Sequence, residues 1–300
     1  MQPGFYVVDV RHGNASVLCG RDGIVIIDTG SRQRLLQFLR DQQIGEIHTV
    51  IISHADRDHC GGLSELLLAS DIRIGTVRLN PDTTQESVAW HDVLTALSVA
   101  EARVGTVIDP SLHSGLDDLD MGEARVEVLA PAPATAVRGI GGQEEDGTTI
   151  DRHSMNAVLG ICQGDRRFAL ISGDMSLAGL ESMDERCDVL AADILVFPHH
   201  GGGAGSANTL DFVRRVCELV SPSVVVFSVG DGSLQFPREE VLLAVLENLP
   251  DTLIFATGDA PTLASLIESN DGCGHSNATG TIGWSIGTEL GIPSFSRETT

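Results

Sequence analysis

The stretch VIISHADRDHCGG, residues 50–62, joins a run of apolar residues directly to two histidines and two aspartates. The apolar, β-branched start predicts a buried strand, and two glycines follow the polar cluster. Left unpaired, so many ionisable groups at the end of a buried strand would be costly to bury. The cluster is therefore either a solvated loop or the binding site of a positively charged group. Imidazole and carboxylate side chains at this density are typical ligands of Zn²⁺ or a comparable divalent ion.

Ligand-type side chains also collect at other expected strand ends. Asp174 follows the apolar run FALIS, His199 and His200 follow ILVFP, and His153 comes shortly before AVLGI. Polar residues at strand ends of an α/β scaffold commonly face a crevice where sites are built. A lone histidine is more often a surface residue, and we interpret five histidines in that way: His12, His48, His91, His113 and His275.

Short apolar runs bounded by turn residues predict strands throughout the chain. The predicted strands cover residues 5–10, 16–20, 23–30, 49–54, 74–80, 124–131, 155–162, 166–174, 192–201, 223–230, 252–259 and 281–287. Helical spacing of apolar residues is found over 31–45, 62–70, 84–102, 176–187, 208–219 and 238–249. Ser31 is the expected N-cap of the first helix, and Gly45 its expected stop.

Each half of the chain thus presents a hairpin followed by alternating helices and strands. Two such halves packed together predict an α/β protein with two sheets covered by helices, a four-layer αββα sandwich. We expect residues 1–300 to form a single domain with a short C-terminal tail. One segment breaks the pattern, because residues 130–152 are rich in Pro, Gly and acidic residues. This composition predicts a loop insertion, either a lid or a disordered segment.

The charge balance bears on the partners of the chain. With 42 acidic and 19 basic residues, the formal net charge is −23. Nucleic-acid binders normally carry a basic footprint, so long nucleic acid is disfavoured as a partner. No apolar run is long enough for a membrane helix, and the N-terminus lacks the features of a signal peptide. Scattered cysteines in a chain of this size indicate reduced thiols and a cytoplasmic protein.

Taken in order, the motifs resemble those of the metallo-β-lactamase superfamily, whose signature is H-x-[HD]-x-D-H after a strand. The form Ser-His-x-Asp-x-Asp-His-x-Gly-Gly at residues 53–62 resembles the hydrolase domain of ComEC-type competence proteins and their stand-alone relatives. The resemblance extends over roughly residues 5 to 284. The other matching motifs are Asp28-Thr29-Gly30, DRHSMNAVL from residue 151, ISGD ending at Asp174, and VFPHHGG from residue 196.

The resemblance implies the αββα fold and a dinuclear centre in which two divalent ions activate a bridging water for hydrolysis. One ion would be held by His54, Asp56 and His153, and the other by Asp58, His59 and His199. Asp174 would bridge the two ions, and Asp58 or Asp174 would accept a proton during catalysis.

Two ligand assignments stay open. Asn156 is an alternative to His153, and His200 is an alternative to His199. Many members carry histidine in place of Asp56, so this site is harder and suits Mn²⁺ as well as the expected Zn²⁺.

The chain departs from the group at one point, because Phe236 stands where the relatives have a histidine. Phenylalanine can neither hydrogen-bond a phosphoryl oxygen nor protonate a leaving group.

We expect a hydrolase acting on a phosphodiester, in a small molecule, a nucleotide or a short nucleic acid. The alternatives are hydrolysis of a lactone, thioester or amide, and a metal-bound sensor or interaction module with little turnover.

Overall fold

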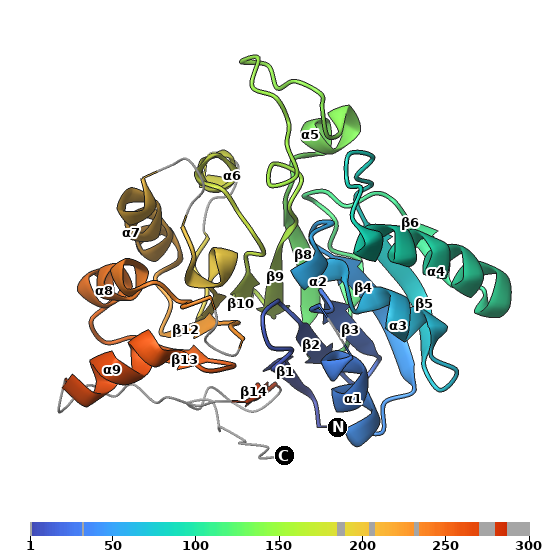
Figure 1. Cartoon of the computed structure of the whole chain (residues 1–300), viewed down its shortest axis with the longest axis horizontal. Coiled ribbons are helices and arrows are strands. Elements are labelled where there is room, and N and C mark those ends of the chain that lie inside the picture. The colour runs from blue at the N-terminus through green and yellow to red at the C-terminus, as the bar shows by residue number, and fades with distance from the viewer. Residues whose placement is uncertain are drawn as a thin grey trace.

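The computed structural model describes residues 2–31, 33–184, 190–203, 208–230, 234–269 and 280–286. Two mixed β-sheets lie face to face, and helices cover the outer face of each (Figure 1). This arrangement confirms the predicted four-layer αββα sandwich.

The first sheet is built from the N-terminal half and one C-terminal strand. Its order is β14 (Ile282–Ser285), β1 (Gly4–Val7), β2 (Ser16–Cys19), β3 (Ile24–Ile27), β4 (Glu46–Ile52), β5 (Arg73–Leu79) and β6 (Val107–Asp109). The pairs from β14 to β3 are antiparallel, and those from β3 to β6 are parallel. The last described strand therefore crosses over to pair with the first, β1.

The second sheet repeats this plan. Its order is β13 (Leu253–Ala256), β12 (Val224–Phe227), β11 (Ile194–Val196), β10 (Arg166–Ile171), β9 (Val158–Gln163), β8 (Arg125–Ala130) and β7 (Leu119–Asp120). The pairs from β7 to β10 are antiparallel, and those from β10 to β13 are parallel. In both sheets the parallel strands end at the same edge, where loops can build a site.

The helices divide between the outer faces (Figure 1). The first sheet is covered by α1 (Arg34–Asp41), α2 (Arg57–Cys60), α3 (Leu63–Leu68) and α4 (Val88–Val104). The second is covered by α6 (Leu177–Asp184), α7 (Thr209–Val220), α8 (Glu239–Asn248) and α9 (Pro261–Ser269). A short 3₁₀ turn, η1 (Pro198–Gly201), follows β11.

Strand alternation generates three apolar layers between these elements. On β3, Val25 and Ile27 point into the layer between the sheets, whereas Ile26 points toward the helices. The β4 residues Ile51 and Val50 divide in the same way. Because side chains of a strand alternate between faces, each sheet contributes to both an inner and an outer core. The parallel strands are consequently apolar on both faces, which explains the uninterrupted apolar runs of the sequence.

Several local predictions were wrong. Helix α1 begins at Arg34 with Gln33 as N-cap, and Ser31 Oγ instead donates to the His12 carbonyl oxygen over 3.3 Å. The strands β6 and β7 and the helices α2 and α9 were not predicted. These elements are short or begin within a turn motif, so they present too little periodicity to be detected.

The segment 130–152 is also more structured than its composition predicted. It contains the helix α5 (Pro133–Arg138), and an isolated bridge pairs Gln143 with Thr149. Pro133 occupies the first turn, where its missing N–H costs nothing, and Gly139 ends the helix with φ +70°. Figure 1 shows α5 projecting beyond the sandwich. No helix among the described residues is long and apolar enough to cross a bilayer.

Candidate metal centre

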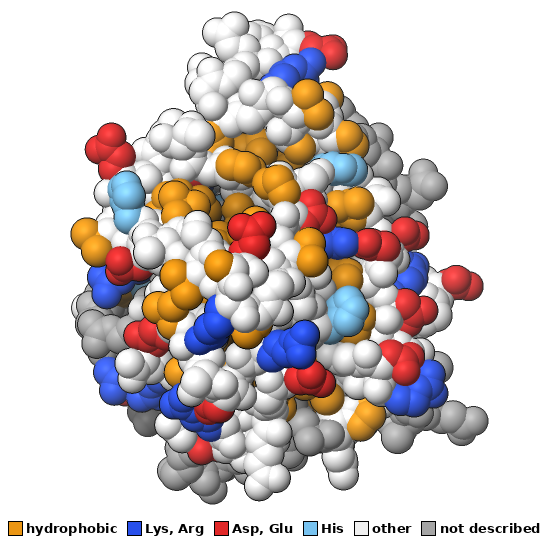
Figure 2. All heavy atoms as spheres, turned by 90° about the vertical axis from the view of Figure 1, so that its right-hand side faces the viewer, with side chains coloured by type: hydrophobic (Ala, Val, Ile, Leu, Met, Phe, Trp, Pro, Cys, Tyr) orange, Lys and Arg blue, Asp and Glu red, His pale blue; other side chains and the backbone are white. Residues whose placement is uncertain are grey.

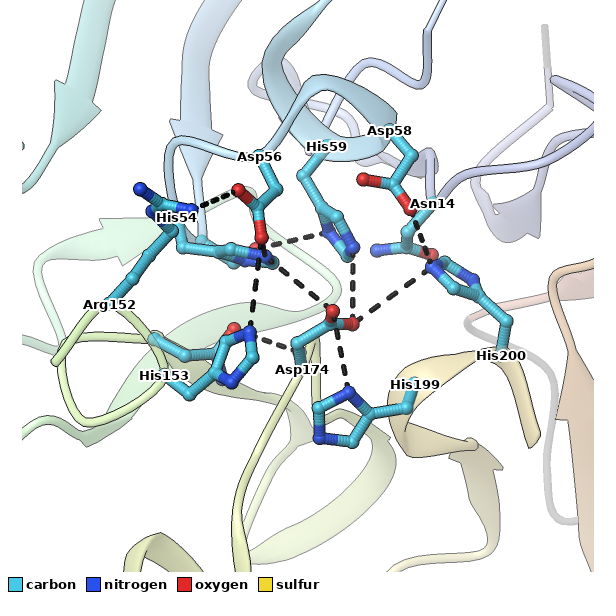
Figure 3. A network of polar contacts seen from close by, with 12 residues as sticks. Asn14, His54, Asp56, Asp58, His59, Arg152, His153, Asp174, His199 and His200 are labelled. Atoms are coloured by element: carbon cyan, nitrogen blue, oxygen red, sulfur yellow. Dashed lines mark hydrogen bonds and ion pairs between the residues drawn. The ribbon is translucent and has the colours of Figure 1, made fainter. Parts of the chain in front are cut away.

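The predicted ligand-type side chains gather where the ends of β4, β10 and β11 meet. Figure 3 shows the Asp174 carboxylate at the centre, surrounded by imidazoles that come from three separate segments. His54 and Asp56 follow β4, and Asp58 and His59 lie on α2. The others are His153 before β9, Asp174 after β10, and His199 and His200 on η1.

Three groups of side chains have ligand atoms within 4.8 Å of one another: His54, Asp56, His153 and Asp174; His59, Asp174 and His200; and His12, Asp58 and His200. Asp174 belongs to two groups, as a bridging ligand would. His200 also belongs to two groups and joins Asp58 to His59. The geometry therefore suits two neighbouring cations that share Asp174.

The ring of His59 is fixed by a carboxylate behind it. Nδ1 of His59 lies 2.8 Å from Oδ2 of Asp28, which is completely buried. A carboxylate only accepts, so Nδ1–H donates, and Nε2 on the other side of the ring faces Oδ1 of Asp174 at 3.2 Å. Asp28 itself is held by the backbone N–H of Ser53 over 2.7 Å and by the amide of Asn14 over 3.0 Å. His59 is thus oriented before any ligand arrives.

The imidazoles of His54 and His200 are oriented in the same way, with Nδ1 hydrogen-bonded on the side away from the centre. Ser53 Oγ donates to Asp28, and it lies 3.1 Å from Nδ1 of His54, from which it can accept. Nδ1 of His200 lies 2.9 Å from the carbonyl oxygen of Ser228, which can only accept. In each ring the Nδ1–H is occupied, and the Nε2 lone pair is directed to the centre.

Four buried polar atoms at the centre form no hydrogen bond with any of the described residues. They are Nε2 of His54, Nε2 of His59, Nε2 of His200 and Oδ1 of Asp174. Unsatisfied buried polar atoms are rare, because each loses its hydration without compensation. Three imidazole nitrogens and one carboxylate oxygen converging in this way form a suitable donor set for Zn²⁺ or Mn²⁺.

The surroundings of the central carboxylates favour their ionised form. Burial alone would raise the pKa of Asp174, but the adjacent imidazoles of His59 and His199 hold it well below the usual value. Burial would likewise raise the pKa of Asp58, and the adjacent imidazoles of His12 and His200 lower it instead. Several negative charges are therefore held together, and divalent cations would neutralise them.

Asp56 carries its own counter-charge. Nη1 of Arg152 donates to Asp56 Oδ1 over 2.7 Å, and Nε of the same guanidinium donates to the buried Asp82 over 2.7 Å. The other oxygen, Oδ2, faces Nε2 of His54 at 3.4 Å and Nε2 of His153 at 3.8 Å. One oxygen of Asp56 is therefore paired with Arg152, and the other is available for a cation.

The position of Asn156 differs from that of a ligand. Its Nδ2 donates to the carbonyl oxygen of Ser172 over 2.9 Å, and its Oδ1 accepts from the backbone N–H of Asp174 over 2.9 Å. Gly173 adopts φ +52°, and a Cβ there would lie 2.3 Å from Asn156 Oδ1. Asn156 therefore shapes the turn that presents Asp174, while His153 contributes to the first group of ligand atoms.

Of the two adjacent histidines, His200 is the better placed for a shared cation. Its Nε2 lies 3.4 Å from Asp58 Oδ2 and 3.9 Å from Asp174 Oδ1. Nδ1 of His199 lies 3.4 Å from Asp174 Oδ2, and its ring packs edge-on against His153 at 5.3 Å between centroids. His199 belongs to none of the three groups found among the described residues. The geometry thus favours His200 as the ligand, whereas the motif resemblance favours His199.

His12 was interpreted as a surface residue, and the structure places it beside the centre. Its Nε2 lies 3.2 Å from Asp58 Oδ2, and its ring lies 4.8 Å from that of His200. The loop after β1 carries His12 to this position. No motif spacing in the sequence connects His12 with residues 54–59. Arg152 was also missed, although its position directly before His153 was the one available signal.

The profile of the metallo-beta-lactamase superfamily matches residues 8–223, more than half of the chain. The chain therefore belongs to the metallo-β-lactamase superfamily. Among curated proteins, the alkyl/aryl-sulfatase BDS1 of Saccharomyces cerevisiae is 26% identical over 113 residues. That match spans 35% of this chain and 18% of the sulfatase.

Solved structures share the fold at low sequence identity. Tm1679, a metal-dependent hydrolase of the β-lactamase superfamily, superposes with a TM-score of 0.51 at 16% identity, covering 84% of this chain and 95% of its own. The E377D mutant of the β-hydroxylase CmlA gives a TM-score of 0.52 at 16% identity, covering 94% of this chain and 54% of its own. The fold thus occurs in proteins named for different reactions, and the substrate has to be argued from the site.

Proposed function

We propose that the chain is a dinuclear metal-dependent hydrolase of a small phosphodiester. The observation that supports metal binding most directly is that four buried polar atoms without a hydrogen bond face the centre: Nε2 of His54, His59 and His200, and Oδ1 of Asp174. Two divalent ions bound by such a set, with Zn²⁺ expected first and Mn²⁺ second, would polarise the scissile bond and activate water.

The protein side chains would do three things in this reaction. His54, Asp56 and His153 would hold the first ion, and Asp174 would be shared between the two. Asp58, His59 and His200 would hold the second, with His200 in place of the His199 that the motif resemblance implies. An oxygen of Asp58 or Asp174 would accept the proton that the attacking water loses, since both carboxyl groups are held in the ionised state.

A small phosphodiester, a nucleotide or a short nucleic acid is favoured over long nucleic acid. The motif order resembles ComEC-type hydrolase domains, which suggests phosphodiester chemistry. The formal charge of −23 opposes a long polyanion, most strongly at low salt, where screening is weak. On the α4 side of the molecule, acidic, basic and hydrophobic side chains are interspersed (Figure 2). Such a face lacks the continuous basic stripe that extended nucleic-acid binding uses.

The loss of the histidine at position 236 is offset in part by the surroundings. The ring of Phe236 lies 5.8 Å from the ring of His12, which reaches the centre from the loop after β1. An imidazole is therefore present beside Phe236, although it comes from another segment. This arrangement supports a substrate range that differs from that of relatives with a histidine in place of Phe236.

A sulfate ester is the second candidate, because the stretch of similarity to an alkyl/aryl-sulfatase favours it. A sulfate ester has the same tetrahedral oxyanion as a phosphate ester but carries less charge. Lactone, thioester or amide hydrolysis and a low-turnover sensor are the remaining alternatives.

We place the protein in the cytoplasm, in line with the free, buried thiols of Cys19, Cys60, Cys162 and Cys217. Cys187 and Cys273 lie outside the described residues.

The test is a parallel screen of a chromogenic phosphodiester, an aryl sulfate, a lactone and a thioester, each with Zn²⁺ and with Mn²⁺. We expect the phosphodiester to be cleaved fastest, and Asp174→Asn to lower its turnover at least about 100-fold, as removal of a central electrostatic group does. His91→Gln, on the exposed face of α4, is the matched control and should remain active. Cleavage of the sulfate, lactone or thioester alone would replace the proposed substrate, and no turnover with metal bound would support the sensor.

A further inference from the structure

An open cavity of about 980 Å³ lies next to the metal centre. The loop after β1, the start of α1, and α2 with α3 contribute its walls. Its volume is at the upper end of the range found for small-molecule sites. Four of the side chains that line it are arginines: Arg11, Arg34, Arg40 and Arg57.

This concentration of positive charge runs against the composition of the whole chain. The sequence has 19 basic residues against 42 acidic ones, and all of the basic residues are arginines. Four of the 19 line this one cavity, while Glu65 is the sole acidic residue of its described lining. Arginine presents a planar fork of donors that fits the oxygens of phosphate or sulfate, and a lysine would not replace it in that geometry.

The four guanidinium groups are not equally available to a ligand. Arg40 is held by Asp71 through two contacts of 2.7 and 2.9 Å, and Arg34 donates to Asp9 over 3.0 Å. Arg57 is exposed, and its guanidinium has no ion-pair or hydrogen-bond partner in the part of the chain that the structure describes. An incoming anion can therefore pair with Arg57 without breaking an existing ion pair.

Two residues of the cavity lining, Arg57 and His12, adjoin residues of the metal centre. Arg57 stands between Asp56 and Asp58 in the sequence and begins α2. His12 lines the cavity, and its Nε2 lies 3.2 Å from Asp58 Oδ2. A ligand that occupies the cavity would therefore contact His12, which itself contacts Asp58 of the metal centre.

We propose that this cavity binds a second tetrahedral oxyanion of the substrate, a phosphate or sulfate group that is not itself hydrolysed, and that Arg57 is its main partner. The proposal rests on the proposed function for the location of the bond that is cleaved. It narrows the substrate to a molecule with a terminal oxyanion beyond the scissile ester, of about the size of a nucleotide. Arg57 would recognise the oxyanion, because Arg34 and Arg40 are already paired with Asp9 and Asp71.

The first test measures binding without turnover. Chelated, metal-free protein is titrated with inorganic phosphate, sulfate or acetate at constant ionic strength, and binding is followed by calorimetry. We expect phosphate or sulfate to bind more tightly than acetate, and Arg57→Gln to weaken that binding at least about tenfold, as loss of a charged hydrogen bond does. Arg73→Gln, an exposed arginine on β5 outside the cavity, should bind like the wild type. Equal binding to wild type and Arg57→Gln would overturn the proposal.

The second test separates this proposal from the proposed function. The KM of a phosphodiester with a terminal phosphate is compared with that of the same diester without it, in wild type and in Arg57→Gln. We expect the variant to raise the first KM at least about tenfold more than the second. Hydrolysis of both with an unchanged KM ratio would overturn the cavity proposal and leave the hydrolase intact. Arg57-dependent anion binding without any ester hydrolysis would support the cavity proposal and contradict the proposed hydrolase function.

Discussion

Asp28 Oδ2 accepts a hydrogen bond from Nδ1 of His59 over 2.8 Å, although 31 residues separate the two in the chain. Asp28 adopts a left-handed backbone conformation with φ +59°, and its side chain is completely buried. Burial alone would raise its pKa, but the adjacent imidazole of His59 and its hydrogen bond lower it. Asp28 is thus an anion that orients the imidazole without facing the centre itself.

We predict that Asp28→Asn weakens metal binding about 10- to 100-fold, as loss of an outer-shell partner of a ligand histidine does. The amide replaces an acceptor-only group, so the tautomer and orientation of His59 are no longer fixed. Competitive chelator titration measures the affinity. Asp71→Asn, which changes an exposed carboxylate paired with Arg40, is the control and should bind metal normally. An unchanged affinity in Asp28→Asn would mean that packing alone orients His59.

The metal content should be close to two divalent ions per chain. We predict that His200→Ala lowers it toward one, because Nε2 of His200 faces both Asp58 and Asp174. His199→Ala should keep more metal than His200→Ala. The two positions are matched controls, since both have positive φ, +51° and +56°, so any backbone strain is similar. Elemental analysis gives the result, and greater metal loss in His199→Ala would restore the assignment that the motif resemblance favoured.

Cys60 should be dispensable for metal binding, whereas its neighbour Asp58 should not. Burial, with the nearby charges of Asp28, Asp56 and Asp58, raises the pKa of the Cys60 thiol to about 12. Its Sγ lies 3.5 Å from the carbonyl oxygen of Ala55 and packs in the core under α3 and α4. We therefore expect Cys60→Ala to keep both ions and to lose about 1 kcal/mol of unfolding free energy from packing. Asp58→Ala should lose metal, and the reverse pattern in elemental analysis would contradict the ligand assignment.

Arg152 should stabilise the metal-free fold in a way that depends on pH. Burial would raise the pKa of Asp82, but hydrogen bonds from Arg152 and Thr84 lower it. A depressed folded-state pKa contributes stability above the unfolded value, about 3.9, and this contribution is lost as the pH falls through the folded value.

We expect Arg152→Gln to lose about 3 kcal/mol near pH 7, because it leaves Asp82 buried without its cation. The difference from wild type should shrink as the pH falls below about 4, the unfolded value, toward the lowered folded-state pKa of Asp82. Denaturant unfolding of chelated protein between pH 3 and pH 7 measures this. The double variant Arg152→Gln, Asp82→Asn should recover much of the loss. A deficit that stays constant with pH would show that Arg152 acts through packing alone.

The sequence by itself determined which strand ends carry ligand-type side chains, and which residue types those side chains are. Apolar runs ending in His54, Asp174 and His199-His200 placed ligand-type side chains at strand ends, and strand periodicity implied two sheets. These features are readable because alternation and turn residues are local, and a strand end is a local event. The short α2 and α5 were not readable, since four to six residues do not establish a helical period.

The tertiary structure decided which of the candidate atoms meet. His12, Asp28 and Arg152 lie far from residues 54–59 in the chain or have no motif spacing to them, and only the packing of loops against the sheet edge brings them together. The direction of the two adjacent imidazoles likewise depends on Ser228 behind His200. A hydrogen-bond donor is directed by its partner in space, whereas the sequence records only its neighbours along the chain. For that reason the residue types of the centre could be predicted from the sequence. Which of them serve as ligands, supporting groups or cavity wall could not.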